Sequence, residues 1–119
     1  MTPKELEERL INFAVSVIKI ADGLKNSRAG NNMANQIVKS GTSPALNYGE
    51  AQSGESVNDF KHKIQIVLKE LRETMVSLKI IKSAGLHEDL AFIEDVLQEN
   101  NELISIFVST INTLKKNNP

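Results

Sequence analysis

Apolar residues recur along the chain at the spacing of an amphipathic helix, in four separate segments. The first segment has apolar positions 4, 3, 4, 3 and 4 residues apart, at Leu6, Leu10, Phe13, Val17, Ile20 and Leu24. The third and fourth segments repeat this heptad pattern, with Thr74 and Asn100 as polar interruptions. Such spacing keeps apolar side chains on one face of a helix. It predicts helices over about 3–25, 32–51, 57–84 and 88–116.

Local signals at the helix ends agree with these segments. Thr2 before Pro3 is a favourable start for the first helix, and Ser56 followed by Asp59 is a favourable start for the third. Gly85 is a favourable residue after the end of the third helix. Short connections between four helices predict an all-α fold: an antiparallel up-down four-helix bundle forming a single domain over 1–119.

The second segment carries Pro44 in its interior, together with Gly41 and Gly49. Proline lacks the backbone N–H and clashes with the preceding turn. We therefore expect a kink or a loosened turn near Lys39–Ser43, and we expect packing rather than intrinsic propensity to hold this helix.

A polar row runs beside the apolar face of the second helix, and the third helix offers charged residues to meet it. The row on the second helix is Gln36, Ser40, Ser43, Asn47 and Glu50, and the candidate polar seam comprises Gln36, Ser43, Asn47, Glu50, Lys63, Glu70 and Glu73. Polar residues in a helical seam fix register through hydrogen bonds, and this structural role is the favoured interpretation. A groove for a ligand or for nucleic acid is the alternative.

The first and fourth helices each carry a second apolar stripe beside the first. On the first helix this stripe is formed by Ile11, Ala14, Ile18 and Ala21, and on the fourth by Phe92, Val96, Leu103 and Ile106. One explanation is a wide core-facing surface. The favoured explanation is that one stripe is an interface between subunits, because monomers rarely expose such rows.

The formal net charge of −1 hides an uneven distribution. Residues 56–85 hold six basic and three acidic residues, whereas residues 86–119 hold two basic and six acidic residues. Neighbouring helices of opposite charge account for this most simply. The alternative is a basic face on the third helix for RNA or DNA. Its candidate residues are Lys61, Lys69, Arg72, Lys79 and Lys82.

Composition narrows the class of protein further. The chain has no cysteine, no tryptophan and only five other aromatic residues, which disfavours a disulfide framework and a base-stacking platform. The charged start lacks the apolar run of a secretion signal, and no apolar stretch is long enough to span a membrane. A cytoplasmic location is the expectation.

Candidate catalytic groups are sparse. A di-metal bundle needs Glu-x-x-His pairs on two helices, and Asp59 with His62 is the nearest approach. Neither a nucleophile elbow nor a glycine-rich phosphate loop is present. The sequence predicts a non-enzymatic protein with no catalytic residue, no metal, no cofactor and no small-molecule substrate.

The segment from Gln36 to Thr74 resembles the signature of the four-helix-bundle family also called 23S rRNA-intervening sequence proteins. The residues that carry the resemblance are Gln36, Ser40 to Ser43, Asn47, Tyr48, Glu50, Ala51, Ser56, Asp59, Phe60, Lys63, Leu68 to Glu70, Glu73 and Thr74. The resemblance implies a small bacterial protein whose biochemical role is unassigned and whose relatives assemble as pentameric rings. A basic branch of related proteins is thought to bind nucleic acid.

Two hypotheses follow from the residues and the resemblance together. The first is a homo-oligomeric structural or interaction module, with a pentamer implied by the resemblance. The second is a nucleic-acid-binding accessory protein that uses the basic residues of the third helix. The sequence pI of about 6.1 favours the first hypothesis, because phosphate binding usually comes with a basic domain.

Overall fold

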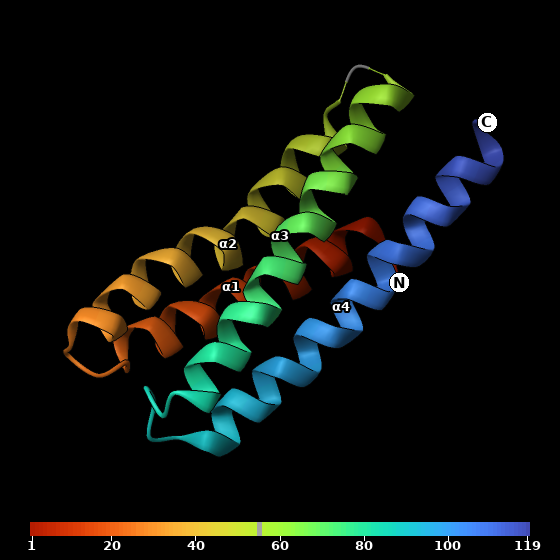
Figure 1. The fold of residues 1–119 in the computed structure, drawn as a ribbon. Coiled ribbons are helices and arrows are strands. Elements are labelled where there is room, and N and C mark those ends of the chain that lie inside the picture. The colour runs from red at the N-terminus through yellow and green to blue at the C-terminus, as the bar shows by residue number, and fades with distance from the viewer. Residues whose placement is uncertain (55) are drawn as a thin grey trace.

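The computed structural model describes residues 1–54 and 56–119 of the chain. Within them the chain forms four α-helices and no β-strand: α1 (Pro3–Asp22), α2 (Arg28–Gln52), α3 (Val57–Ser83) and α4 (Leu90–Asn117). Consecutive helices run in opposite directions along a body of 46 × 23 × 21 Å (Figure 1). This confirms the all-α class and the up-down bundle.

The four helices occupy the corners of an elongated bundle. α2 packs between α1 and α3, and α3 packs between α2 and α4. α1 and α4 also pack against each other, over a less extensive contact than the other neighbouring pairs. Arg9 on α1 strengthens that contact by binding Glu99 on α4 at 2.7 and 2.8 Å. α1 and α3 therefore lie at opposite corners.

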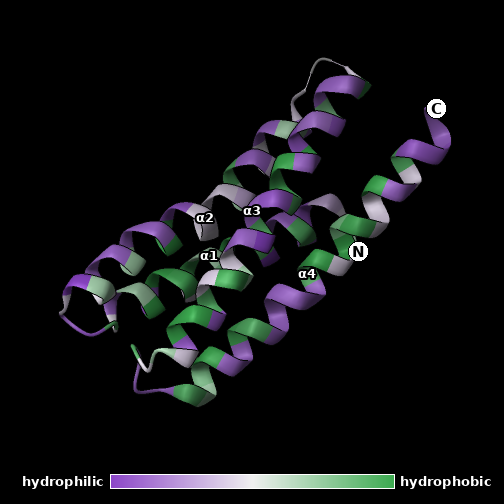
Figure 2. Cartoon of the chain, in the orientation of Figure 1, coloured by the Kyte–Doolittle hydropathy of each residue, from purple (hydrophilic) through white to green (hydrophobic). Residues whose placement is uncertain are grey.

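The core is built from the heptad positions of all four helices. Its largest fully buried side chains include Phe13, Leu10, Ile37, Leu71 and Phe107. The ring of Tyr48 on α2 meets the ring of Phe107 on α4 edge to face, with 5.7 Å between ring centroids. Figure 2 shows hydrophobic residues on the sides of the helices that turn toward the bundle interior. The core is thus mostly apolar, with Ser40, Thr74, Ser77 and Asn100 as its buried polar residues.

Each helix begins at a side chain that accepts a backbone N–H three residues later. The four N-cap residues are Thr2, Ser27, Ser56 and Asp89, at 3.0–3.1 Å. The start predicted for the second helix, residue 32, is wrong because Ser27 caps α2 and residues 28–31 are helical. Gly30 makes this early start possible: a Cβ there would lie 1.9 Å from the Lys25 carbonyl oxygen.

The other helix ends lie within three residues of their predicted positions. α1 ends at Asp22 rather than Lys25, and α4 begins at Leu90 because Asp89 is its cap rather than its first turn. α3 ends in a Schellman arrangement, in which Leu86 N–H donates to the Ile81 carbonyl and Gly85 adopts a φ of 66°. This confirms the predicted stop at Gly85.

The loosened turn expected at Lys39–Ser43 does not occur. α2 is helical without interruption through Pro44, which is buried. This part of α2 is closely packed on both sides. On the α1 side, a Cβ added at Gly41 would lie 2.5 Å from Val17 Cγ1, so the two helices approach very closely. On the α3 side, the Ser40 and Thr74 hydroxyls are hydrogen-bonded.

Candidate functional site

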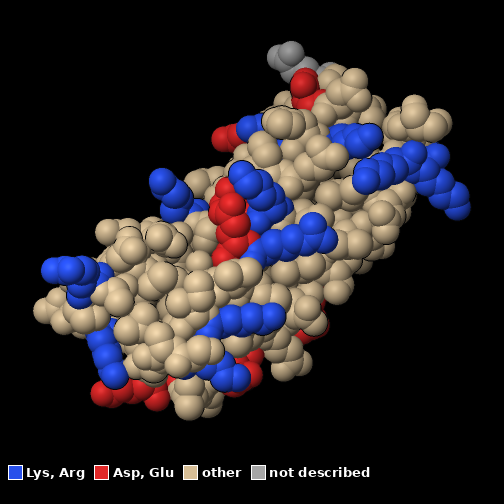
Figure 3. Space-filling view, in the orientation of Figure 1, with Lys and Arg blue, Asp and Glu red and all other residues tan. Residues whose placement is uncertain are grey.

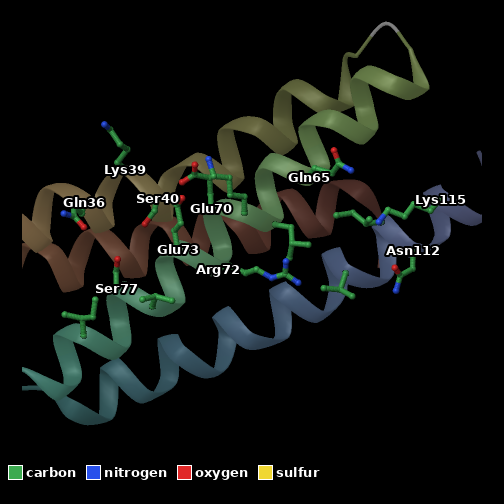
Figure 4. Close-up of a pocket in the computed structure, with 16 residues that line it drawn as sticks. Gln36, Lys39, Ser40, Gln65, Glu70, Arg72, Glu73, Ser77, Asn112 and Lys115 are labelled. Carbon is green, nitrogen blue, oxygen red and sulfur yellow. The ribbon is translucent and has the colours of Figure 1, made fainter.

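A broad hollow of about 1010 Å³ lies over the outward face of α3. Its walls come from three helices, with Lys39 from α2 and Lys115 from α4 on either side of α3. Figure 4 shows Arg72 of α3 extending into the space between α3 and α4. Val76 and Ile80 give the hollow an apolar part, with 57% and 48% of their surfaces exposed. We call this surface the α3 hollow.

Two carboxylates, Glu70 and Glu73, also line the α3 hollow. Burial raises the pKa of the Glu70 carboxyl above its ordinary value, and the neighbouring Glu73 carboxylate raises it further. Lys69 and Lys39 oppose this effect because their charges favour the ionised form. The arrangement is a partly compensated charge cluster on a helix surface.

The structure separates the predicted polar seam into two groups. Near the α2–α3 turn, Lys63 Nζ binds Glu50 Oε2 at 2.5 Å and so links the two helices. The Asn47 amide donates within α2, to the Ser43 hydroxyl at 2.8 Å and the Ser43 carbonyl at 3.0 Å. Farther along the pair, the remaining seam residues, Gln36, Glu70 and Glu73, line the α3 hollow.

The buried polar contacts between helices involve residues outside that seam list. Thr74 on α3 and Ser40 on α2 hydrogen-bond through their hydroxyls at 3.0 Å. The Asn100 amide donates to the Leu71 carbonyl at 3.0 Å, while its Oδ1 has no hydrogen-bond partner within the described part of the chain. Both contacts lie at the polar interruptions of the heptad seams. The polar interruptions can be recognised in the sequence as candidates for buried hydrogen bonds. The residues that they contact depend on the helix register, which the sequence pattern does not give.

Four of the five candidate basic residues of α3 divide between two surfaces. Lys69 and Arg72 line the α3 hollow. Lys79 and Lys82 line a second hollow of about 670 Å³ beside α4, where Lys82 forms an ion pair with Glu94. Lys61 is half-buried near the start of α3. The acidic half of α4 therefore compensates part of the basic stripe, as the charge pattern indicated.

Two further basic residues join the α3 face from other helices. Lys39 and Lys115 are distant from Lys69 and Arg72 in sequence, and the bundle brings them to the same hollow. Figure 3 shows Lys and Arg side chains along this face, with a short acidic band crossing it. Sequence reasoning restricted to one helix missed Lys39 and Lys115. The antiparallel helix order, taken together with the basic positions on all four helices, was the signal that could have placed them on this face.

The surplus apolar surface lies on α1. Ala14 and Ala21 of its second stripe are buried, whereas Ile11, Val15 and Ile18 are 45%, 43% and 40% exposed. These three residues are four and three positions apart, so they share one side of the helix. We call them the α1 row.

The second stripe of α4 is mostly used within the bundle. Val96 and Leu103 are buried, and Phe92 and Ile106 are half-buried against the core.

Two features are absent from the described residues. No helix there is long and apolar enough to cross a membrane. No group of three or more His, Asp or Glu side chains there is arranged to hold a metal ion.

The fold and its surfaces define a small helical-bundle protein with an exposed apolar row on one helix and a basic, partly apolar hollow on the opposite helix. The sequence matches the 23S rRNA-intervening sequence protein family over residues 5–109. The chain therefore belongs to that family, and the resemblance carried by the Gln36–Thr74 segment is confirmed.

One solved structure extends the comparison to the whole bundle. It is a protein of unknown function from the S23 ribosomal protein family of Bacteroides thetaiotaomicron. The two proteins share 28% sequence identity with a TM-score of 0.81, over 89% of this chain and 97% of the other. No curated protein matches the sequence.

Proposed function

We propose that this protein is a non-enzymatic, self-associating helical module whose assembly uses the α1 row. The observation that carries the proposal is the exposure of Ile11, Val15 and Ile18 at 40–45% on one side of a helix whose other side is packed in the core. Covering such a row removes apolar surface from water, which is worth roughly 25 cal/mol per Å². A second protein surface is the simplest cover.

A closed ring of five subunits is the assembly that the family resemblance implies, and we extend it to this chain as part of the proposal. The bundle suits this role because its helices are long and offer extended faces. Such an assembly presents the same surface once per subunit to a binding partner. The proposed role includes no catalysis.

Particle mass measured by light scattering over a range of concentrations tests the proposal. We expect the wild-type protein to form a particle several times heavier than its 13.2 kDa subunit. Val15→Glu places a charge in the α1 row and should shift the protein to the monomer. Val57→Glu is the matched control, because Val57 is similarly exposed at 52% but lies at the start of α3. A monomeric wild type at every concentration would refute self-association.

A second candidate function is nucleic-acid binding through the α3 face. It is favoured by one observation: Lys39 and Lys115 broaden the Lys69–Arg72 cluster across three helices. None of these four side chains has an ion-pair partner within 4 Å among residues 1–54 and 56–119. A face of this kind would contact phosphates without reading sequence.

Fluorescence anisotropy with single-stranded RNA, duplex RNA and duplex DNA at two salt concentrations tests this second function. Four phosphate contacts predict a logarithmic salt slope of roughly −3.6 for duplex DNA. Replacing Lys69 and Arg72 with glutamine should weaken binding and flatten that slope. The same replacement at Lys25, between α1 and α2, and at Arg28, the first residue of α2, is the control. Equal binding by both double variants would exclude the α3 face.

A further inference from the structure

The α1 row and the α3 hollow lie on opposite sides of the bundle. α1 and α3 each pack against α2 and α4, so they occupy opposite corners and their outward faces point away from each other. Both outward faces carry exposed apolar side chains, the α1 row on one and Val76 with Ile80 on the other. A single subunit cannot cover either face with the other.

The two faces also differ in shape. The α1 row is a ridge along one helix, whose three side chains span seven residues, or about 10 Å of helix. The α3 face carries a hollow of about 1010 Å³ that is lined by residues of α2, α3 and α4 (Figure 4). A ridge and a recess are complementary in shape.

The charges beside the two faces have opposite balance. Around the α3 hollow, four basic residues outnumber the two carboxylates of Glu70 and Glu73. Beside the α1 row, three acidic residues stand three or four positions from an apolar member, against one basic residue. The acidic residues are Glu7, Glu8 and Asp22, and the basic residue is Lys19. Opposite balance favours contact between unlike faces over contact between like faces.

We propose that the α1 row of one subunit docks into the α3 hollow of the next subunit. The proposal rests on the self-association proposed above and names the two surfaces that meet. Such a contact is heterologous, because two different patches of the same chain join, and repetition of one heterologous contact closes into a ring when its rotation permits. Each subunit then uses both faces, and neither of these two apolar faces is left exposed within the ring.

A symmetric pairing of two α1 rows accounts for the structure less well. It would leave Val76 and Ile80 uncovered on both subunits, and it would stop at a dimer. It would also place the acidic residues beside one row against those beside the other.

Mixing two variants that are each defective in one face tests the proposal. Val15→Glu damages the α1 row and keeps the α3 hollow, whereas Val76→Glu damages the α3 hollow and keeps the α1 row. Each variant alone should be monomeric by light scattering. An equimolar mixture should form a one-to-one dimer of twice the 13.2 kDa subunit mass, because one intact pair of faces remains. The dimer should grow no further.

The outcomes separate this inference from the proposed function. A monomeric wild type would overturn both. A multi-subunit wild type whose Val76→Glu variant keeps its full mass, or whose two monomeric variants fail to form a dimer on mixing, would overturn the head-to-tail contact alone. Circular dichroism confirms that each variant is folded. Should either variant unfold, Ile18→Glu and Ile80→Glu make the same test on the same two faces.

The proposed contact also predicts competition with the second candidate function. Lys69 and Arg72 belong to the α3 hollow, so a docked neighbour would cover them. If both functions exist, nucleic acid should bind the monomeric Val15→Glu variant more tightly than it binds the wild-type assembly. Equal salt-dependent affinity for the two would show that the α3 hollow is open in the assembly and would overturn the head-to-tail contact.

Discussion

Gly41 is the point of closest approach between α1 and α2, and its replacement by alanine tests the packing directly. A Cβ at this position would lie 2.5 Å from Val17 Cγ1 and 2.9 Å from both Val17 Cβ and Val17 Cγ2. Val17 is fully buried, and its branched side chain is restricted to one preferred rotamer in a helix. The neighbour therefore has little freedom to move away.

Two opposing effects set the magnitude. Alanine in a helix interior is favoured over glycine by about 0.5–1 kcal/mol. Overpacking a well-filled core costs about 1–3 kcal/mol. We expect Gly41→Ala to lower the free energy of unfolding by about 1–2 kcal/mol. An unfolding entropy of about 2.1 cal/mol/K per residue over 119 residues converts this loss to a melting temperature about 4–8 °C lower.

Gly49→Ala provides the matched control in the same helix. A Cβ at Gly49 meets no described atom within 4 Å, so only the propensity gain remains. We expect a stabilisation of about 0.5–1 kcal/mol. Urea denaturation and thermal melting of both variants at one protein concentration measure the difference. A Gly41→Ala protein as stable as the Gly49→Ala protein would refute the close α1–α2 packing.

Three further substitutions probe polar contacts of the bundle. Asn100→Leu removes a buried Oδ1 that has no partner among the described residues, at a gain of about 1–3 kcal/mol, and the Nδ2 hydrogen bond to the Leu71 carbonyl, at a loss of about 0.5–1.5 kcal/mol. We expect the free energy of unfolding to rise by about 1 kcal/mol, and a lower value in urea denaturation would contradict this. Glu70 has a raised pKa, so the fold favours its neutral form and loses stability as pH rises above the ordinary value of 4.5. The stability advantage of Glu70→Gln should therefore grow from pH 4.5 to pH 8, and a constant difference would show that the shift is absent. Arg9→Lys breaks the bidentate contact with Glu99 and should cost about 1 kcal/mol in low salt and less in high salt; equal stability of the two proteins in low salt would argue against a structural role for this pair.

Local signals identified most of the fold because they depend on neighbours in the sequence. The heptad seams placed four helices, and Thr2, Ser56 and Gly85 marked three of their ends correctly. The errors arose where distant contacts overrode local preference. Pro44 was expected to disturb α2, yet packing against α1 and α3 keeps that helix continuous.

The candidate surfaces also differ in whether local sequence signals or contacts between distant residues reveal them. Lys69 and Arg72 were visible as part of a stripe on one helix, whereas Lys39 and Lys115 reached the same hollow only through the bundle. The apolar surplus was visible as second stripes on two helices. The structure decided that α4 uses its stripe in the core and that α1 leaves part of its stripe exposed, because exposure depends on which neighbours a helix has.

The sequence by itself determined the helices, their approximate ends, the bundle class and the family resemblance, since each rests on periodicity or on a run of residues within one segment. Only the tertiary structure decided the helix register, and register is set by side-chain packing across the bundle. That packing pairs Thr74 with Ser40 and Asn100 with Leu71. It also places the α1 row and the α3 hollow on opposite sides of the molecule.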